Sequence, residues 1–181
     1  MDSMQTYSEE RNTLDEIRTS LNVVNFQLFN WKLKKDCASF KVSVGKVESM
    51  FKFKLNTKGN SSIGYLVPLE VNCNLSFQAK RVFYIYGVPP NNIRASHAYH
   101  NTEQVLICLS GNLKIKCFDG IDENIYELNS PDEAIYISPK VWRTTFEHSS
   151  DAVLLVLSSL EYNELDYIRD YNEFLEVVKC T

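Results

Sequence analysis

Short apolar runs rich in β-branched and aromatic residues follow one another along most of this chain. From Tyr65 onward they recur about every ten residues, and Gly, Pro, Asn and Asp fill the gaps between them. Short strands without intervening helices are typical of antiparallel sheets that form a sandwich or a barrel. The pattern therefore predicts an all-β fold of the jelly-roll or β-barrel type. The predicted strands are YLVPLEV, KRVFYIYGV, TEQVLICLSG, NLKIKCF, ENIYEL, EAIYIS and DAVLLVLSS.

Turn residues mark several of the connections. Ser110-Gly111-Asn112 separates two apolar runs and Asp119-Gly120 follows the run IKCF, so both predict tight hairpins. The Thr-Lys-Gly-Asn sequence at 57–60 predicts a further turn. Earlier in the chain, the stretches VVNFQLFNWKL, ASFKVSVGKV and MFKFKL predict additional strands.

Two segments show helical spacing instead of alternation. Residues 8–22 place apolar side chains on one face and predict a short amphipathic N-terminal helix. Residues 164–178 (ELDYIRDYNEFLEVV) predict a C-terminal helix that packs across the barrel. The apolar stripe of this second helix consists of Tyr167, Tyr171, Phe174, Leu175 and Val178.

The composition is that of a folded globular protein. The chain has 181 residues, of which 44% are hydrophobic and 23% charged, so one main core is expected. Its net charge of −4 argues against general binding to nucleic acid or to an anionic membrane, because both need an excess of Lys and Arg. An anionic ligand would therefore need a local cluster of basic residues.

The polar, acidic N-terminus (MDSMQTYSEERN) is unlike a signal peptide, and no apolar stretch approaches the ~18 residues of a membrane span. We therefore expect a cytoplasmic protein. The five cysteines are odd in number and lack C-x-x-C spacing, so neither a disulfide framework nor a zinc cluster is predicted. Cys108 and Cys117 lie inside apolar runs and are expected to be buried thiols.

The segment RASHAYHNTEQ, residues 94–104, holds two of the three histidines of the chain. It leads into a predicted strand, and in a strand successive side chains alternate between faces. His97 and Tyr99 are therefore predicted to share a face, with His100 on the other. Glu103 joins His97 and Tyr99 if no bulge intervenes.

This segment favours acid/base chemistry over metal binding. A metal site in a barrel of this kind would need His-x-His, a later Glu and a distant His, but Tyr99 occupies the second position of the pair. A neutral imidazole at His97 can accept a carbon-bound proton, and the Tyr99 hydroxyl can donate to a developing oxyanion. The alternative is that His97 only satisfies a hydrogen bond in the barrel wall, and spacing alone does not decide between the two.

Three arginines stand at predicted strand ends in an otherwise acidic chain. Arg81, Arg94 and Arg143 could clamp a diphosphate through paired hydrogen bonds, or they could form surface ion pairs. Aromatic residues nearby could stack on a base or a sugar, or belong to the core. These aromatic residues are Phe83, Tyr84, Tyr86 and Trp142.

The stretch from Gly64 to Phe174 resembles a known family. The motifs that carry the resemblance are Arg-Val-aromatic-Tyr-Ile, Arg-x-x-His-Ala, Glu-Gln-Val-Leu, Leu-Ser-Gly, Pro-x-x-x-Arg and Asp-Tyr-Ile-Arg-x-Tyr. In combination they are similar to the sugar-nucleotide 3,4-ketoisomerases of the WxcM-like cupin group. Those enzymes act on dTDP-4-keto-6-deoxyglucose in the pathways to dTDP-3-amino-3,6-dideoxyhexoses.

One departure from the family pattern falls on the histidine segment. Family members usually have Arg-Gly-x-His-Ala-His-Lys, with both histidines implicated in proton transfer. In this chain Tyr99 stands at the second histidine, so His97 is the imidazole carried over by position. Ala95 replaces the Gly, and His100 occupies the Lys position. The positions that match the family are Arg94, His97, Ala98 and Gln104.

The resemblance implies a cupin-type jelly roll that moves a carbonyl group from C4 to C3 of the sugar through an enediolate, without a metal or a redox cofactor. It implies His97 as the base, and Tyr99 as donor to the enediolate oxygen or as proton relay to C4. Phosphate, oxyanion and cavity-lining contacts with the substrate are expected from Arg81, Tyr84, Arg94, His100, Gln104 and Arg143.

The resemblance also implies an assembly. Family members form dimers, often by exchanging N-terminal strands, so we expect a homodimer. Residues 1–45 are then an N-terminal extension, and residues 46–181 are the cupin domain. No nucleic acid or membrane partner is expected.

Two other functions stay open on the sequence. Tyr99 and Ala95 would also suit an inactive cupin that binds a sugar nucleotide and serves a partner enzyme. An RmlC-type epimerase also uses a histidine base in a jelly roll, although it resembles this sequence less in its motifs. Appearance of a 3-keto product would distinguish the isomerase from both.

Overall fold

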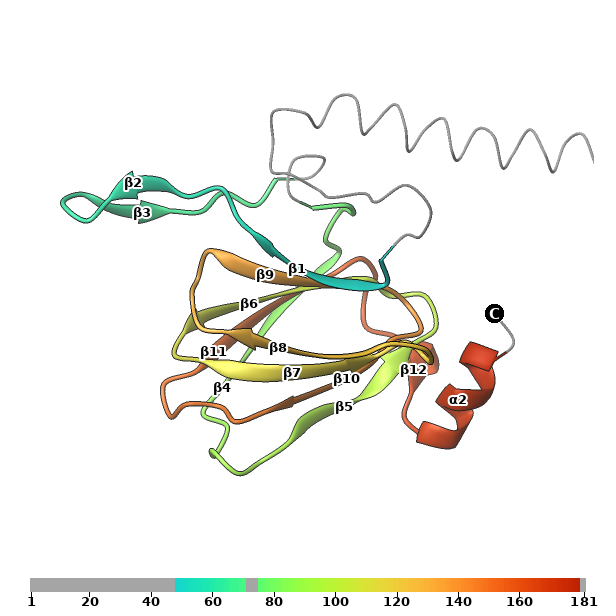
Figure 1. Ribbon diagram of the computed structural model, residues 1–181. Helices are drawn as coiled ribbons and strands as arrows, with labels where there is room; N and C mark the ends of the chain where they lie inside the picture. Colours follow the sequence, from blue (N-terminus) through green and yellow to red (C-terminus); the bar gives the residue numbers. More distant parts are fainter. Residues whose placement is uncertain (1–47, 71–74, 180–181) are drawn as a thin grey trace, which may run out of the picture. The chain divides into compact units, whose positions relative to one another are not determined.

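The computed structural model describes residues 48–70 and 75–179, which belong to the second of the two units of the chain, residues 40–181. This unit contains two five-stranded antiparallel sheets packed face to face (Figure 1). The first sheet has the order β1 (Met50–Lys54), β9 (Glu133–Ile137), β6 (Gln104–Ser110), β11 (Val153–Ser158) and β4 (Arg81–Tyr86). The second has the order β12 (Tyr167–Ile168), β5 (Arg94–Tyr99), β10 (Trp142–Phe146), β7 (Leu113–Phe118) and β8 (Glu123–Leu128).

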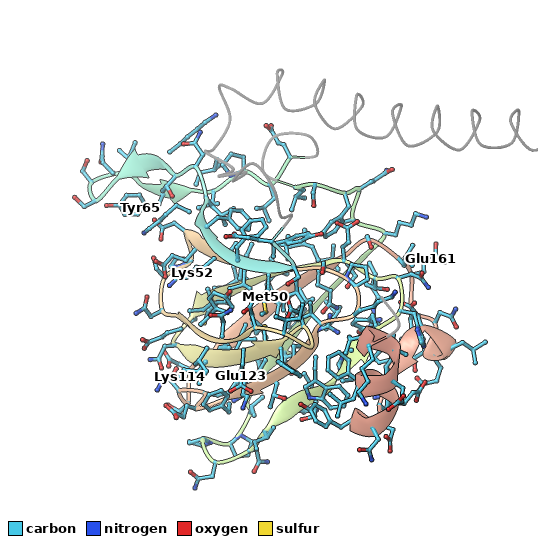
Figure 2. The ribbon with its side chains drawn as sticks, turned by 45° about the vertical axis from the view of Figure 1, so that its right-hand side comes forward. Met50, Lys52, Tyr65, Lys114, Glu123 and Glu161 are labelled. Carbon is cyan, nitrogen blue, oxygen red and sulfur yellow. The ribbon has the colours of Figure 1, made fainter. Side chains whose placement is uncertain are left out.

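The main core lies between the two sheets, as the alternating pattern predicts. Along β7, Leu113, Ile115 and Cys117 are fully buried. The intervening side chains point away from the core, and Lys114 and Glu123 lie on this outer side of the second sheet (Figure 2). Each buried aliphatic side chain contributes roughly 1.5–3 kcal/mol. The other members of this core are Met50, Leu106, Cys108, Leu128, Ile135, Ile137, Val141, Leu154 and Val156.

Both predicted hairpins are confirmed. Gly111, between β6 and β7, has φ 67°, and a Cβ atom there would lie 2.2 Å from Ser149 Oγ and 2.8 Å from the Ala152 amide nitrogen. Only glycine fits this turn without a clash. Gly120, between β7 and β8, likewise has positive φ.

The predicted turn at 57–60 is wrong. Lys58–Asn60 forms strand β2, which pairs with β3 (Gly64–Leu66), and the chain reverses at residues 61–63. The Asn60 side chain explains the shift, because its Oδ1 accepts the backbone N–H of Ser62 and of Ile63 and so stabilises the later turn. A further strand, β10, occupies a stretch for which no strand was predicted.

The C-terminal helix is shorter than predicted. Helix α2 spans Tyr171–Lys179, whereas Glu164–Asp166 forms a 3₁₀ turn (η1) and Tyr167–Ile168 forms β12. Asp170 determines where α2 begins, because its carboxylate accepts the backbone N–H of Asn172 and of Glu173. The strand before it is held by pairing with β5, which puts Tyr167 opposite Tyr99.

Helix α2 covers part of the outer face of the second sheet. Phe174 is fully buried and packs against Phe118 and Trp142, with ring centroids 6.0 and 5.5 Å away. Ala98 of β5 and Ile168 of β12 belong to the same cluster. Since successive residues of a strand point to opposite faces, Tyr99 and Tyr167 must point inward, between the sheets.

Several predictions fall outside the described residues: the N-terminal helix at 8–22, the strands in residues 23–47, and the extension formed by residues 1–45. Within residues 48–70 and 75–179, no helix has the length and apolar character that crossing a membrane requires.

Candidate active site

Three aromatic rings meet at one end of the interior. His97 and Tyr99 share a face of β5, as predicted, with ring centroids 4.9 Å apart. β12 adds Tyr167, whose ring centroid lies 4.5 Å from that of Tyr99 and 4.9 Å from that of His97. A potential base therefore lies beside two phenolic hydroxyl groups.

The neighbouring strand β10 brings a cation into this cluster. Arg143 pairs with His97 in the β5–β10 ladder, and its guanidinium carbon lies 4.5 Å above the ring centroid of Tyr99. Arg143 is 1% exposed, and its Nε, Nη1 and Nη2 atoms are buried without a hydrogen-bond partner among the described residues. A buried guanidinium without a partner is energetically costly, and an anionic group bound beside it would supply the missing acceptors.

A second arginine reaches the cluster from the first sheet. The Nη1 atom of Arg81 donates to the Tyr167 hydroxyl at 3.4 Å. Its guanidinium carbon lies 4.4 Å from the ring centroid of Phe83 and 5.0 Å from that of Tyr162, so it is packed between two rings. Arg81 thus connects β4 with β12 across the sandwich.

A third arginine packs against the ring of Tyr167. The guanidinium carbon of Arg169 is 4.4 Å from the Tyr167 ring centroid. Its Nε and Nη2 atoms donate to the Glu164 carboxylate at 2.8 and 3.1 Å. The hydroxyl of Tyr162 also donates to Glu164. This carboxylate therefore orients Arg169 beside the cluster.

The surroundings of His97 keep its imidazole neutral. Burial and, next, the positive charge of Arg143 lower the pKa of His97 to about 4. The charges of Arg169 and Arg81 act in the same direction, and only the Ala95 carbonyl opposes them. At neutral pH the ring can therefore accept a proton.

The pKa of Tyr99 is shifted in the opposite direction to that of His97. Burial raises the pKa of Tyr99, and the adjacent Tyr167 hydroxyl raises the pKa further. Arg143 stays charged, because burial lowers its pKa only to about 10. At neutral pH the site thus holds a neutral base, a protonated phenol and a buried cation.

A β-bulge lies directly before His97 in strand β5. His97 pairs with Arg143 and Ala95 pairs with Thr144, so Ser96 is an extra residue. Ala95 and Ser96 have φ of 68° and 55°, which is left-handed backbone that favours glycine.

Arg94 lies beyond this bulge and is exposed, at the end of β5 away from the cluster. Burial lowers the pKa of His148, and the positive charge of Arg94 lowers it further. The Nε2 atom of His148 lies 3.1 Å from Thr145 Oγ1. Arg94 is therefore not among the arginines that surround His97.

Two other predicted residues lie close to the cluster. Gln104 is buried, and its amide donates to Ser158 Oγ at 3.0 Å. Ser158 pairs with Gln104 on one side and with Arg81 on the other, so the three face the interior in one cross-strand row. His100 follows β5, and its backbone N–H donates to the Asp166 carbonyl at 2.9 Å.

The prediction that Tyr84 lines the cavity is wrong. Arg81 and Phe83 point inward from β4, so Tyr84 points outward and is 64% exposed, next to Tyr86. Glu103 also does not join His97, because the chain turns at residues 100–103. The Glu103 carboxylate instead accepts the Tyr136 hydroxyl at 2.6 Å.

The sequence reasoning missed Tyr167 and Arg169 as site residues. The spacing of apolar residues predicted a helix for this stretch. Strand β12 forms there instead, and its two-residue period places both side chains near the cluster. The signal that could have found them is the i, i+2 spacing of Tyr167 and Arg169 in the Asp-Tyr-Ile-Arg motif, because this spacing places two side chains on one face of a strand.

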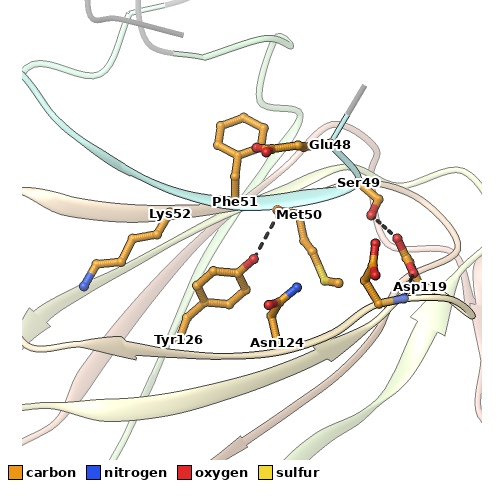
Figure 3. A pocket seen from close by; sticks show the side chains of 9 residues that line it. Glu48, Ser49, Met50, Phe51, Lys52, Asp119, Asn124 and Tyr126 are labelled. Carbon is orange, nitrogen blue, oxygen red and sulfur yellow. Dashed lines mark hydrogen bonds between the residues drawn. The ribbon is translucent and has the colours of Figure 1, made fainter. Parts of the chain in front are cut away.

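A cavity of about 490 Å³ lies elsewhere, between β1 and the turn after β7 (Figure 3). It holds none of the predicted site residues, and the carboxylates of Glu48, Asp119 and Asp122 line it. Such a lining disfavours an anionic ligand. Among the described residues, no group of three His, Cys, Asp or Glu side chains is arranged to bind a metal ion.

Comparison with known proteins identifies relatives that cover most of this unit. The family described as "FdtA: WxcM-like, C-terminal" matches residues 46–179. The TDP-4-oxo-6-deoxy-alpha-D-glucose-3,4-oxoisomerase of Aneurinibacillus thermoaerophilus is 40% identical over 117 residues, which are 65% of this chain and 84% of that protein.

Solved structures give the same result. A 3,4-ketoisomerase from Helicobacter canadensis is 38% identical, with a TM-score of 0.69, and the match covers 72% of this chain and 97% of that one. The sugar 3,4-ketoisomerase QdtA from Thermoanaerobacterium thermosaccharolyticum, in complex with TDP, is 37% identical, with a TM-score of 0.71 and coverage of 75% and 98%. A mutant of QdtA has been solved with TDP-4-keto-6-deoxyglucose. The chain therefore belongs to the WxcM-like, C-terminal (FdtA) family.

Proposed function

We propose that this protein is a 3,4-ketoisomerase that converts TDP-4-keto-6-deoxyglucose into the corresponding 3-keto sugar. The identity of 40% to a curated oxoisomerase and of 37% to QdtA supports this reaction and this substrate. The two facing antiparallel sheets are consistent with the cupin-type jelly roll expected from the sequence. The cytoplasmic location stays a prediction from the sequence.

His97 is the base of the proposed reaction. The carbonyl at C4 of the sugar acidifies the C3 hydrogen, and the neutral imidazole accepts that proton. The electrons of the C3–H bond form a C3–C4 double bond, and those of the C4 carbonyl move to its oxygen as an enediolate. The low pKa of His97 in the ligand-free protein ensures that the proton-accepting form is present at neutral pH.

Arg143 and Tyr99 stabilise the enediolate. The three guanidinium nitrogens beside His97 have no hydrogen-bond partner within residues 48–70 and 75–179. Tyr99 is a protonated phenol that can donate to the oxygen at C4. The imidazolium then gives its proton to C4 while the oxygen at C3 loses its proton and forms the new carbonyl. Tyr99 passes the proton that the C3 oxygen loses to the C4 oxygen, so the product is an isomer of the substrate.

These steps move electrons only within the sugar, so no redox cofactor is needed. The remaining cations have supporting roles: Arg81 and Arg169 are placed to contact the phosphates or the sugar, and Gln104 lies in the adjoining row. Arg94 and His100 keep their predicted substrate contacts only if the ligand reaches beyond the cluster.

The single observation that carries this proposal is the fully buried guanidinium of Arg143, which has no hydrogen-bond partner among the described residues and lies next to a neutral imidazole. A histidine that only completes the barrel wall would not need an uncompensated cation beside it. The pair is suited to a reaction that takes up a proton and develops negative charge at adjacent atoms.

The test is to incubate the protein with TDP-4-keto-6-deoxyglucose and a 3-aminotransferase and to follow the 3-amino product. The wild type should form it. His97→Asn should lower kcat by about 10²–10⁴-fold, the usual contribution of a general base, with little change in ligand affinity. His148→Asn is the matched control, since His148 is buried beside Thr145 at the other end of β10 and should retain turnover.

Other outcomes would support the alternatives. Ligand binding without product would favour an inactive binding module, the role suggested by Tyr99 in place of a histidine. Deuterium uptake from solvent without carbonyl migration would favour an epimerase. Full activity of His97→Asn would remove His97 from the mechanism.

We also propose that the protein is a homodimer. On edge strand β4, the side chains of Val82, Tyr84 and Tyr86 are all more than half exposed and share the outer face. An exposed apolar face on an edge strand is a common site of association. This role replaces the predicted substrate contact of Tyr84.

A further inference from the structure

The hydroxyl group of Tyr167 lies between a cation and the phenol at the reaction centre. Arg81 Nη1 donates to it at 3.4 Å, and the Tyr167 ring centroid lies 4.5 Å from that of Tyr99. Backbone pairing of Tyr167 with Tyr99 in the β5–β12 ladder fixes the two side chains on the same face. This contact therefore follows from the fold of the C-terminal segment rather than from a flexible side chain.

We propose that Tyr167 is a positioning residue that completes a directed hydrogen-bond chain from Arg81 through Tyr167 and Tyr99 to the enediolate oxygen. This inference rests on the proposed ketoisomerase function. It assigns to a second tyrosine the task of making Tyr99 an effective donor.

The direction of the chain follows from the donors available. A guanidinium only donates, whereas a phenol both donates and accepts. With Arg81 donating to Tyr167, the Tyr167 proton is free to point to Tyr99, and the Tyr99 proton to the substrate. Each donor polarises the next, so the cation at the far end strengthens the last hydrogen bond of the chain.

Formation of the oxyanion sets the direction of the last two hydrogen bonds in this scheme. Burial and, next, the neighbouring Tyr167 hydroxyl raise the pKa of Tyr99, so Tyr99 keeps its proton until an oxyanion forms. When an oxyanion forms, Tyr99 turns its proton toward the oxyanion and Tyr167 becomes the donor. No proton is transferred in this step, and no co-reactant is required.

The packing around Tyr167 allows its hydroxyl to be removed selectively. Its ring contacts His97 and Tyr99, and Arg169 lies on its face. Phenylalanine would keep these ring contacts and lose only the hydroxyl. Tyr167→Phe should therefore fold normally, which its thermal unfolding temperature would check.

The experiment is a double-mutant cycle on kcat for carbonyl migration. Tyr99→Phe should lower kcat about 10²-fold, as loss of an oxyanion donor does. Tyr167→Phe should lower kcat about tenfold in the wild-type background, with KM unchanged, and less than about twofold in the Tyr99→Phe background. Tyr171→Phe is the matched control, because Tyr171 packs on Trp142 in α2 and should leave kcat unchanged.

The outcomes separate this inference from the proposed function. If the wild type forms no 3-keto product, the ketoisomerase function fails. If the wild type is active but Tyr167→Phe retains kcat, or its effect is the same in both backgrounds, the hydrogen-bond chain is wrong and the function stands.

Discussion

At the residue scale, the imidazole of His97 lies within the electrostatic influence of three arginine side chains. Arg143, Arg169 and Arg81 all lower the pKa of His97, and the rings of Tyr99 and Tyr167 pack against it. The protein thus holds a weak base in the free state. An anionic ligand would offset these charges, so substrate binding should raise the basicity of His97 at the moment when it is needed.

The pH dependence of kcat/KM reports the pKa values of catalytic groups in the free enzyme. Its acid limb should fall as pH approaches about 4, the pKa of His97, rather than near the ordinary value of 6.5. The measurement is initial rate at low substrate concentration over the range in which the protein stays folded. An acid limb near 6.5 would contradict the environment described for His97.

The same shift predicts a change in stability with pH. The pKa of His97 is about 4 when folded and 6.5 when unfolded, so between these values the unfolded chain binds more protons. The free energy of unfolding should therefore decrease as pH falls from 6.5 toward 4. His97→Asn should lose this component, and urea unfolding of both proteins at several pH values would measure it.

Arg143 should contribute to activity without stabilising the fold. Its buried guanidinium makes no hydrogen bond to the described residues, and replacing such a group by an apolar one of similar size is often neutral or stabilising. Arg143→Met should therefore lower kcat/KM by at least about 10²-fold while the free energy of unfolding stays equal or rises. A large loss of stability would show that the guanidinium has a structural partner.

At the element scale, the segment before α2 serves the site more than the core. Asp166 of η1 is buried and accepts hydrogen bonds from the backbone and side chain of Asn101, at 2.9 and 3.0 Å, and from Thr102. These bonds tie the turn after β5 to the start of β12. They consequently keep Tyr99 and Tyr167 in register.

Asp166→Ala should be strongly destabilising, because it leaves buried donors without acceptors. We expect a loss of roughly 3 kcal/mol in the free energy of unfolding. Asp170→Ala is the matched comparison: it removes the exposed cap of α2 and should cost about 1 kcal/mol. Chemical denaturation would measure both, and equal losses would contradict the role given to Asp166.

The sequence predicted those features of the structure that depend only on residues close together in the chain. His97 and Tyr99 share a face because strands alternate, and the turns at Gly111 and Gly120 were evident from their residues. Pairing between distant strands was not predictable in this way. That Arg143 lies opposite His97 depends on β5 and β10 becoming neighbours, although more than forty residues separate them.

Two errors have the same physical origin. The stripe through Tyr167 fits a helix, but pairing with β5 and the cap at Asp170 override that propensity. Tyr84 belongs to a correctly predicted strand, yet alternation does not say which of its faces meets the other sheet. In both cases tertiary contacts decided the orientation of the side chain.

At the scale of the whole molecule, the two sheets differ in what covers their outer faces. Helix α2 covers part of the second sheet, and residues such as Leu75 and Phe77 cover part of the first. The β4 edge of the first sheet keeps Tyr84 and Tyr86 exposed. This uncovered region is where the proposed dimer contact belongs.

Tyr84→Lys should therefore shift the protein from dimer to monomer. A charge in an apolar contact is costly to bury, and a tenfold or greater increase in the dimer dissociation constant is expected. Ile125→Lys is the matched control, since Ile125 is equally exposed on the other sheet. Light scattering over a range of concentrations would measure both, and a monomeric wild type would exclude the dimer.

The bulge in β5 places two residues in left-handed backbone immediately before the base. Alanine in this conformation costs about 1 kcal/mol that glycine would avoid. The methyl group of Ala95 thus causes a local conformational cost close to His97. Ala95→Gly would remove it, which makes this position a natural starting point for engineering a more thermostable form of the protein.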